Sequence, residues 1–202
     1  MAVVWLLGSE CVVCGAGARG VCQRCSDALV APVVPPLLAV HSATVLCSYE
    51  GVGAELVKAV KYGNQRQAIG PLLDALVPSL PAGSEAVIAV PSDPERVRVR
   101  GHNLTAALAS GIAKRIDVPT IEPLVRVSRR PQTGKGRAER KQVEFQAHQG
   151  VPEHVILVDD VVTTGATAVA CALALGLAGA RRTDFVALAS TPAGDPEVVK
   201  AG

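Results

Sequence analysis

Aromatic side chains are scarce in this sequence of 202 residues, which contains one tryptophan, two tyrosines and two phenylalanines. Because apolar residues still make up 49% of the chain, a hydrophobic core is possible, but valine, alanine and leucine must fill it. The same scarcity argues against a surface that binds single-stranded nucleic acid by stacking bases on aromatic rings.

A strong excess of charge of one sign is also lacking, since the formal net charge is only +2. This excludes a protein that binds nucleic acid over its whole surface, so basic clusters must be judged one by one. No apolar run is long enough to span a membrane, and the apolar residues 1–8 lack the positive flank of a secretion signal. We expect a cytoplasmic protein with one α/β domain and a small appendage.

The most informative motif is VILVDDVVTTGAT at residues 155–167. Its apolar start predicts a strand buried on both faces, as in a parallel sheet, and residues 168–177 predict a helix. Between them we expect an acidic turn, with Asp159 and Asp160 at the sheet edge where ligands bind. Carboxylates accept hydrogen bonds from sugar hydroxyls, whereas hydroxyls and amides at a helix N-terminus bind phosphate. A sugar 5-phosphate suits both halves of the motif.

Two other interpretations of this motif exist. One is an ordinary strand-to-helix turn that carries two surface acids. The other is a different kind of phosphate loop, but the lysine and the spacing of a P-loop are absent.

Other segments predict further parts of the same sheet and site. Strands are expected at residues 43–49, 86–90, 121–127 and 182–190. The second of these ends in Pro91 and Ser92, where another group of the ligand would bind. The alternating residues Arg96, Arg98 and Arg100 form either a solvated edge or, as we favour, an anion site.

Two groups of basic residues remain. Lys58 and Lys61 belong to a helix expected over residues 50–62, where they are expected on its solvated side. Residues 128–141 are polar and basic and predict a flexible loop that closes over an anionic substrate. A nucleic-acid contact and a plain solvated tether are the alternatives for this loop. Its candidate binding residues are Arg130, Lys135, Arg137 and Arg140.

Four cysteines near the N-terminus form two C-x2-C pairs, namely Cys11, Cys14, Cys22 and Cys25. This spacing is typical of a structural Zn²⁺ site with four thiolates, although iron also suits such ligands. Cys47 and Cys171 lie in apolar runs and are expected in the core. A proline-rich segment then separates a cysteine module, residues 1–35, from the main domain, residues 40–202.

VILVDDVVTTGAT resembles the phosphoribosyl pyrophosphate (PRPP) motif of the type I phosphoribosyltransferases. This resemblance implies their fold, with an acidic pair that binds the ribose hydroxyls, a TTGAT loop that binds the 5-phosphate, and Mg²⁺ that accompanies the diphosphate. The catalytic residues that it implies are Asp159, Asp160 and Arg100. The implied PRPP-binding residues are Pro91, Ser92, Asp159, Asp160, Val161, Thr163, Thr164, Gly165, Ala166 and Thr167.

The order of motifs along the chain narrows the resemblance. A four-cysteine module precedes Lys58…Lys61-Tyr62-Gly63, Arg100-Gly101-His102-Asn103, the basic loop and the PRPP motif. This order is similar to that of the ComF family, in which a zinc finger is joined to a phosphoribosyltransferase domain. It implies transfer of a 5-phosphoribosyl group to a nitrogen acceptor, a nucleobase or another amine, with release of pyrophosphate, and a link to DNA uptake during competence. A non-catalytic PRPP sensor and a single-stranded DNA-binding protein of the uptake machinery remain alternatives.

Overall fold

A computed structural model of the chain describes residues 10–18, 20–63, 68–128 and 143–191. A five-stranded parallel sheet forms its centre, in the order β1-β7-β6-β2-β3. The basic-loop residues Arg130, Lys135, Arg137 and Arg140 lie outside the described part of the chain. The strands of the sheet are β1 (Ser42–Ser48), β2 (Ala86–Ala89), β3 (Thr120–Ile121), β6 (His154–Val162) and β7 (Arg182–Ser190).

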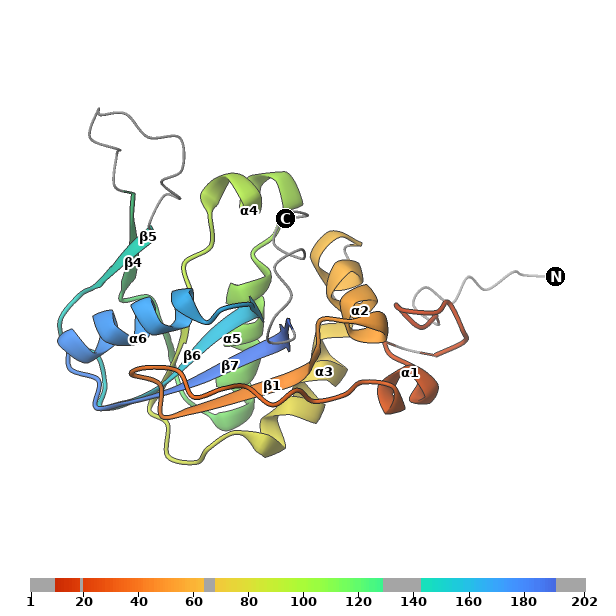
Figure 1. Ribbon diagram of the computed structural model, residues 1–202, viewed down its shortest axis with the longest axis horizontal. Coiled ribbons are helices and arrows are strands. Elements are labelled where there is room, and N and C mark those ends of the chain that lie inside the picture. The colour runs from red at the N-terminus through yellow and green to blue at the C-terminus, as the bar shows by residue number, and fades with distance from the viewer. Residues whose placement is uncertain (1–9, 19, 64–67, 129–142, 192–202) are drawn as a thin grey trace.

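Helices cover both faces of this sheet (Figure 1), so the expected α/β class with a mostly parallel sheet is confirmed. One face packs against α6 (Ala166–Leu177), and the other against α2, α3 and α5. In the described part of the chain, each helix is too short or too polar to span a bilayer. The remaining helices are α1 (Gln23–Asp27), α2 (Gly51–Tyr62), α3 (Ile69–Leu76), the 3-10 helix η2 (Val77–Ser79), α4 (Pro94–Arg100) and α5 (Leu104–Ile116).

Burial on both faces explains why β6 has a continuous apolar run. Val155 and Leu157 belong to the core on the α6 face, whereas Ile156 and Val158 belong to the core on the opposite face. Each of the four is almost completely buried. Successive side chains of a strand point to opposite faces, so a strand between two helical layers needs apolar residues at every position.

The strand expected over residues 121–127 is two strands in the structure. β3 ends at Ile121, and β4 (Leu124–Ser128) pairs with β5 (Val143–Ala147) in a separate antiparallel ribbon that projects from the sheet (Figure 1). Pro123 lies between them. Because proline lacks the N–H that a sheet ladder requires, it ends the parallel strand and lets the chain change direction.

The alternating arginines lie on a helix that the sequence analysis did not expect. Asp93 caps α4 by accepting a hydrogen bond from the backbone N–H of Glu95 at 2.9 Å, and Pro94 occupies its first turn. Asp at the N-cap followed by Pro is a strong helix start. In a helix Arg96 and Arg100 share one side, whereas Arg98 points elsewhere.

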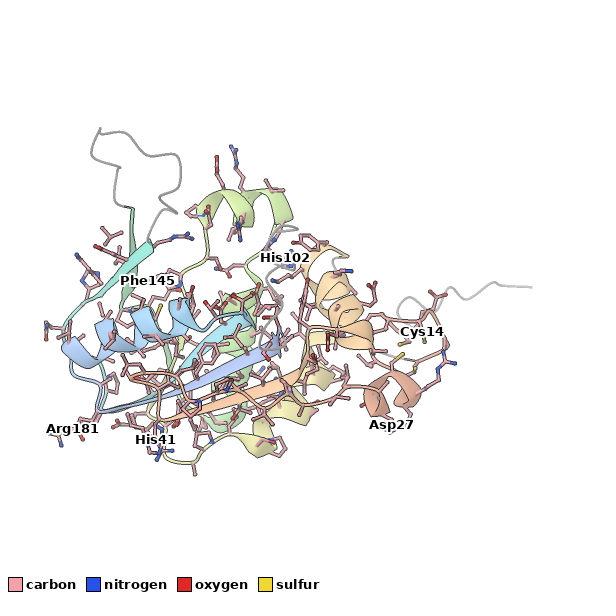
Figure 2. The ribbon with its side chains drawn as sticks, viewed as in Figure 1. Cys14, Asp27, His41, His102, Phe145 and Arg181 are labelled. Atoms are coloured by element: carbon pink, nitrogen blue, oxygen red, sulfur yellow. The ribbon has the colours of Figure 1, made fainter. Side chains whose placement is uncertain are left out.

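The cysteine module lies beside α2 at the end of the molecule away from the β4–β5 ribbon (Figure 1), and Cys14 and Phe145 mark these two ends in Figure 2. Val12, Val13 and Val21 of the module pack against the core formed by α2, α3 and α5. The connecting segment then runs along β1, where the backbone N–H of Ser48 donates to the carbonyl oxygen of Val30 at 2.8 Å. The connection to β1 is therefore packed on the main domain.

Candidate functional site

The acidic pair lies inside β6, not in a turn after it. Asp159 is in register with Ala187 of β7, and the pairing continues to Val162. The expected acidic turn is therefore wrong: β7 is long enough to pair with β6 beyond both acids. Alternation along the strand sends Asp159 toward the loop before α6 and Asp160 toward α2, where Lys61 ion-pairs with it.

Asp159 has an unusual carboxyl group. Burial, followed by the negative charge of Asp160, raises the pKa of Asp159 to about 7, although a hydrogen bond from the Asp160 backbone N–H and the charge of Lys61 oppose this rise. That N–H donates to Asp159 Oδ1 at 2.8 Å. The Asp159 carboxyl group thus accepts a hydrogen bond from the backbone, while its surroundings disfavour its negative charge.

This raised pKa predicts that Asp159→Asn increases stability. A folded-state pKa above the unfolded value means that folding favours the protonated carboxyl, so wild-type stability is lost as pH rises from about 4 to about 7. The variant avoids this loss. We expect no gain near pH 4 and a gain of at least about 1 kcal/mol at pH 8, which is a few degrees in melting temperature.

Thermal melts of both proteins between pH 4 and pH 8 measure this effect. Asp74→Asn is the matched control because the Asp74 side chain is 68% exposed. Its melting temperature should follow that of the wild type across the range. A gain for Asp159→Asn that does not grow between pH 4 and pH 7 would contradict the proposed burial of charge.

Residues 163–167 form the loop after β6 and the first residues of α6. Gly165 is the residue before the helix and has a φ of 75°, a left-handed conformation that favours glycine. A Cβ at this position would also overlap the side chain of Leu37 from the segment before β1. A small cavity of about 40 Å³ lies inside the loop, between Asp159 and the start of α6, where the backbone N–H of Ala166 donates to Thr164 Oγ1 at 3.4 Å.

A larger cavity of about 240 Å³ adjoins this loop. Asp159, Asp160, Val161 and Thr167 form one wall of it. The structure thus brings the acidic pair together with the loop that follows β2. The residues that complete the lining are Val90, Pro91, Ser92, Asp93, Arg96, Arg100, Thr105, Arg126 and Phe145.

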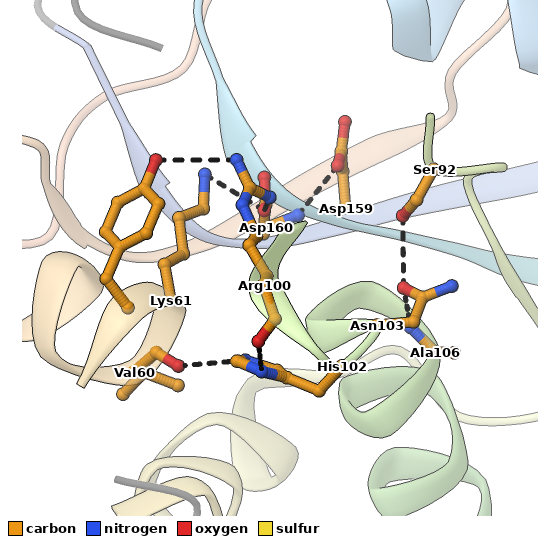
Figure 3. A network of polar contacts seen from close by, with 10 residues as sticks. Val60, Lys61, Ser92, Arg100, His102, Asn103, Ala106, Asp159 and Asp160 are labelled. Atoms are coloured by element: carbon orange, nitrogen blue, oxygen red, sulfur yellow. Dashed lines mark hydrogen bonds and ion pairs between the residues drawn. The ribbon is translucent and has the colours of Figure 1, made fainter. Parts of the chain in front are cut away.

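The loop after β2 is held in place by α5. The Ser92 hydroxyl donates to Asn103 Oδ1 at 3.0 Å, and the same oxygen accepts the backbone N–H of Ala106 at 3.1 Å, so that Asn103 caps α5 (Figure 3). This helix cap ties Ser92 to the second helical layer. The loop next to the acidic pair therefore has a defined position.

Arginines supply positive charge to the cavity. Arg96 and Arg100 line it from α4 and Arg98 does not, as expected for helical spacing. Arg126 also lines it, from β4, and its Nη1 lies 3.8 Å from Asp93 Oδ2. Sequence reasoning missed Arg126 and Phe145, because only the antiparallel ribbon brings them to this cavity.

Lys61 is the other residue that the sequence analysis misplaced. Its Nζ lies 2.9 Å from Asp160 Oδ2, and its side chain is only 12% exposed, so the expected solvated position is wrong for this lysine. Lys58, whose side chain is 54% exposed and pairs with Glu55, does lie on the solvated side of α2. The spacing of apolar residues in α2 shows which side of the helix is buried. It does not show that the carboxylate of Asp160 lies near the C-terminal end of this helix.

Lys61 and Arg100 form a network around Asp160 (Figure 3). Arg100 Nη1 lies 4.0 Å from Asp160 Oδ2, its Nη2 donates to the Tyr62 hydroxyl at 3.4 Å, and its guanidinium lies 5.2 Å from the centre of the Tyr62 ring. Behind it, the His102 ring nitrogens lie 3.0 Å from the Arg100 carbonyl oxygen and 3.2 Å from the Val60 carbonyl oxygen. These contacts join the ends of α2 and α4 above the acidic pair.

The four cysteines of the N-terminal module come together as the sequence predicts. Their sulfur atoms all lie within 4.8 Å of one another, with 3.6 Å between Cys14 Sγ and Cys22 Sγ. Four sulfurs placed tetrahedrally at about 2.3 Å from Zn²⁺ are roughly 3.8 Å apart, so the cluster suits such an ion. Cys11 Sγ also accepts the backbone N–H of Cys22 at 3.3 Å.

The thiols differ in their readiness to ionise. Although burial opposes it, backbone hydrogen bonds from Cys22, Cys14 and Val13 lower the pKa of Cys11 to about 6. Burial and the neighbouring thiols raise the pKa of Cys25 to about 12. A cation at the centre of the cluster would let all four thiols ionise together, which agrees with a structural metal site.

Comparison with known proteins gives similarities at the level of solved structures. No protein-family model matches the chain, and no curated protein matches it. A purine phosphoribosyltransferase from Pyrococcus horikoshii Ot3 is similar at 19% identity, with 61% of this chain and 74% of that chain covered and a TM-score of 0.46. An adenine phosphoribosyltransferase from Leishmania tarentolae is similar at 13% identity, with 80% and 94% covered and a TM-score of 0.49.

Proposed function

We propose that this chain binds PRPP and transfers its 5-phosphoribosyl group to a nitrogen nucleophile, with release of pyrophosphate. One observation carries the proposal. Asp159 and Asp160 near the end of the central strand, residues 163–167 and Arg100 all line one or both of two adjoining cavities. Sugar hydroxyls, a phosphate monoester and a diphosphate each require one of these three kinds of group.

The 5-phosphate is assigned to the small cavity in the loop. The amides of the first turn of α6 have no carbonyl partner within the helix, and Thr163, Thr164 and Thr167 line the same cavity. This end of the helix also carries the positive part of its dipole. Neither feature depends on which acceptor reacts, so the 5-phosphate of PRPP would bind at this helix end whatever the acceptor is.

The ribose is assigned to the acidic pair. A carboxylate has no proton to donate, so it binds groups that present O–H or N–H, and the neighbouring 2- and 3-hydroxyls of ribose do so. The charge of Asp160 is balanced by Lys61 at 2.9 Å and Arg100 at 4.0 Å. An acidic pair can therefore lie close to a phosphate-binding loop without repelling its ligand.

The diphosphate is assigned to the larger cavity, which Arg96, Arg100 and Arg126 line. These guanidinium groups would stabilise the departing pyrophosphate while positive charge develops at C1 of the sugar. The carboxylates of Asp93, Asp159 and Asp160 are hard oxygen ligands that suit Mg²⁺, which would offset diphosphate charge when bound. The chemistry thus depends on positioning and electrostatics, without a nucleophile from the protein.

We also propose membership of the ComF family, with a four-cysteine module, residues 1–35, and a phosphoribosyltransferase domain, residues 40–202. The order of motifs along the chain supports this, as does the sulfur cluster. The acceptor would be a nucleobase or another amine. A role in DNA uptake rests on the family resemblance and would add single-stranded DNA or the uptake machinery as partner.

Calorimetric titration of PRPP with Mg²⁺ tests the binding part of this proposal. Replacing both acids, Asp159→Asn with Asp160→Asn, should weaken PRPP binding about 100-fold, because two carboxyl groups that accept sugar hydroxyls are lost. The Asp74→Asn variant should bind as the wild type does. Equal affinity in the double variant and the wild type would overturn the assignment of the ribose. Pyrophosphate release with a panel of nucleobases and amines then tests the transfer.

A further inference from the structure

Lys61 occupies a position that ordinary surface lysines avoid. Its side chain is 12% exposed, and that of its partner Asp160 is 16% exposed. Leu56, Val57 and Val60 on the same helix are almost completely buried, so core packing holds the last turn of α2 in place. The ammonium group is therefore delivered to Asp160 by the fold.

Stability does not explain this placement. Removing two charges from water costs free energy that their mutual attraction often only just returns, so a buried ion pair is weak evidence for a stabilising role. Asp160 also has a second cation in Arg100, at 4.0 Å from the same oxygen. An additional lysine on an acid that lies in a ligand cavity points to a role in binding.

The geometry points to Lys61 as a diphosphate-binding residue that Asp160 holds ready in the free protein. This inference rests on the proposed function, in which Asp160 accepts a ribose hydroxyl. When the sugar hydroxyl reaches Asp160, Lys61 exchanges part of its contact with the carboxylate for the diphosphate that enters beside Arg100. The flexible stem and compact charge of a lysine permit this exchange better than a planar guanidinium fixed by stacking.

The contacts of Arg100 explain why Lys61, and not Arg100, would move from Asp160 to the diphosphate. Its guanidinium is fixed by the Tyr62 hydroxyl and ring, and it lines the cavity where the diphosphate is assigned. Among the residues that the structure describes, the Lys61 ammonium group forms its ion pair with Asp160, which also lines that cavity. A small rotation of the lysine stem would therefore bring its ammonium group to an anion bound next to Arg100.

Two ligands that differ only in the diphosphate separate this role from a structural one. In Lys61→Gln we expect the dissociation constant for PRPP to rise about tenfold or more, because a charge-assisted contact is lost. Ribose 5-phosphate, which lacks the diphosphate, should bind Lys61→Gln about as it binds the wild type, because Arg100 still balances the charge of Asp160. Lys61→Arg should restore most of the PRPP affinity.

Lys58→Gln is the matched control, since Lys58 lies one turn earlier on α2 with its side chain 54% exposed. It should bind both ligands as the wild type does. Lys61→Met, which keeps the apolar stem, repeats the test if the glutamine variant melts at a lower temperature. Equal weakening of both ligands, or no change in PRPP binding, would overturn the role of Lys61 alone. A wild-type protein that binds neither ligand would overturn the proposed function itself.

Discussion

Replacing Asp184 by alanine is expected to lower the free energy of unfolding by about 3 kcal/mol, because three partly buried donors then lose a buried acceptor. Asp184 lies in β7 and is 0% exposed. Its carboxylate accepts hydrogen bonds from Ser42 Oγ at 2.6 Å, His154 Nε2 at 2.6 Å and Arg182 Nε at 2.9 Å. These donors come from β1, β6 and β7, so one carboxylate joins three adjacent strands at the edge opposite the cavity.

The same hydrogen bonds set the pH dependence of this contribution. Burial would raise the pKa of Asp184, but the contacts with Ser42, His154 and Arg182 outweigh it and leave the pKa below its ordinary value. A lowered carboxyl pKa stabilises the fold above the unfolded value of about 4, and this stabilisation is lost as pH falls through the folded value. The difference between wild type and Asp184→Ala should therefore shrink below about pH 4.

Urea denaturation at pH 7 and at pH 3 measures both effects. Asp74→Ala is the matched control: it removes a carboxylate that is 68% exposed and has one ion pair, with Arg115 at 2.8 Å. Such an exposed pair contributes less than about 1 kcal/mol. If Asp184→Ala costs no more than Asp74→Ala at pH 7, the three-strand cluster does not stabilise the sheet.

Removing a metal from the four-cysteine module is expected to unfold that module. The described part of the module has little regular structure of its own: short bridges join Glu10 to Gly17 and Cys11 to Gly20, the helix α1 is only five residues long, and a few valines pack on the main domain. Binding of structural Zn²⁺ by such small units contributes apparent free energies of about 10–16 kcal/mol, which is folding free energy. Without the ion, four clustered thiols also lose the cation that lets them ionise together.

Metal analysis and hydrogen exchange measure this expectation. Because one Zn²⁺ ion takes four thiolate ligands, the purified protein should contain about one Zn²⁺ per chain. The Cys22→Ser variant should contain little Zn²⁺. Chelation should increase exchange in residues 10–18 and 20–27 while the parallel sheet stays protected, which would support two units with a boundary near residues 35–40. Cys47→Ala, which alters a buried cysteine outside the cluster, should keep the metal. Iron in place of zinc, or full retention by Cys22→Ser, would contradict the zinc assignment.

Some parts of this protein follow from its sequence alone. Residues 155–158 have no polar alternation, so a strand formed by them must be buried on both faces. This predicted the central strand and the α/β class. The paired C-x2-C spacing likewise predicted that four cysteines close in sequence share one site, and their sulfur atoms do cluster in the structure. The cysteine contacts are local in sequence. The strand follows from hydrophobicity, which any strand inside a covered parallel sheet requires.

Other parts depended on the tertiary structure. The alternation of Arg96, Arg98 and Arg100 suits an extended edge as well as a helix, and the cap at Asp93 decided for the helix, which sends only two of them to the cavity. Lys61 has the sequence context of a solvated lysine, but the register of α2 against β6 brings it to Asp160. The length of β7 decided that the acids lie within β6.

The division has one physical reason. Hydrophobic periodicity and cysteine spacing record which groups avoid water or share a ligand, and these preferences hold wherever the segment lies. Which charged groups meet is decided by the relative placement of helices and strands that are distant in sequence. Asp160 with Lys61, and Asp184 with Ser42 and His154, are contacts of this second kind, and they carry the binding and stability predictions made for this protein.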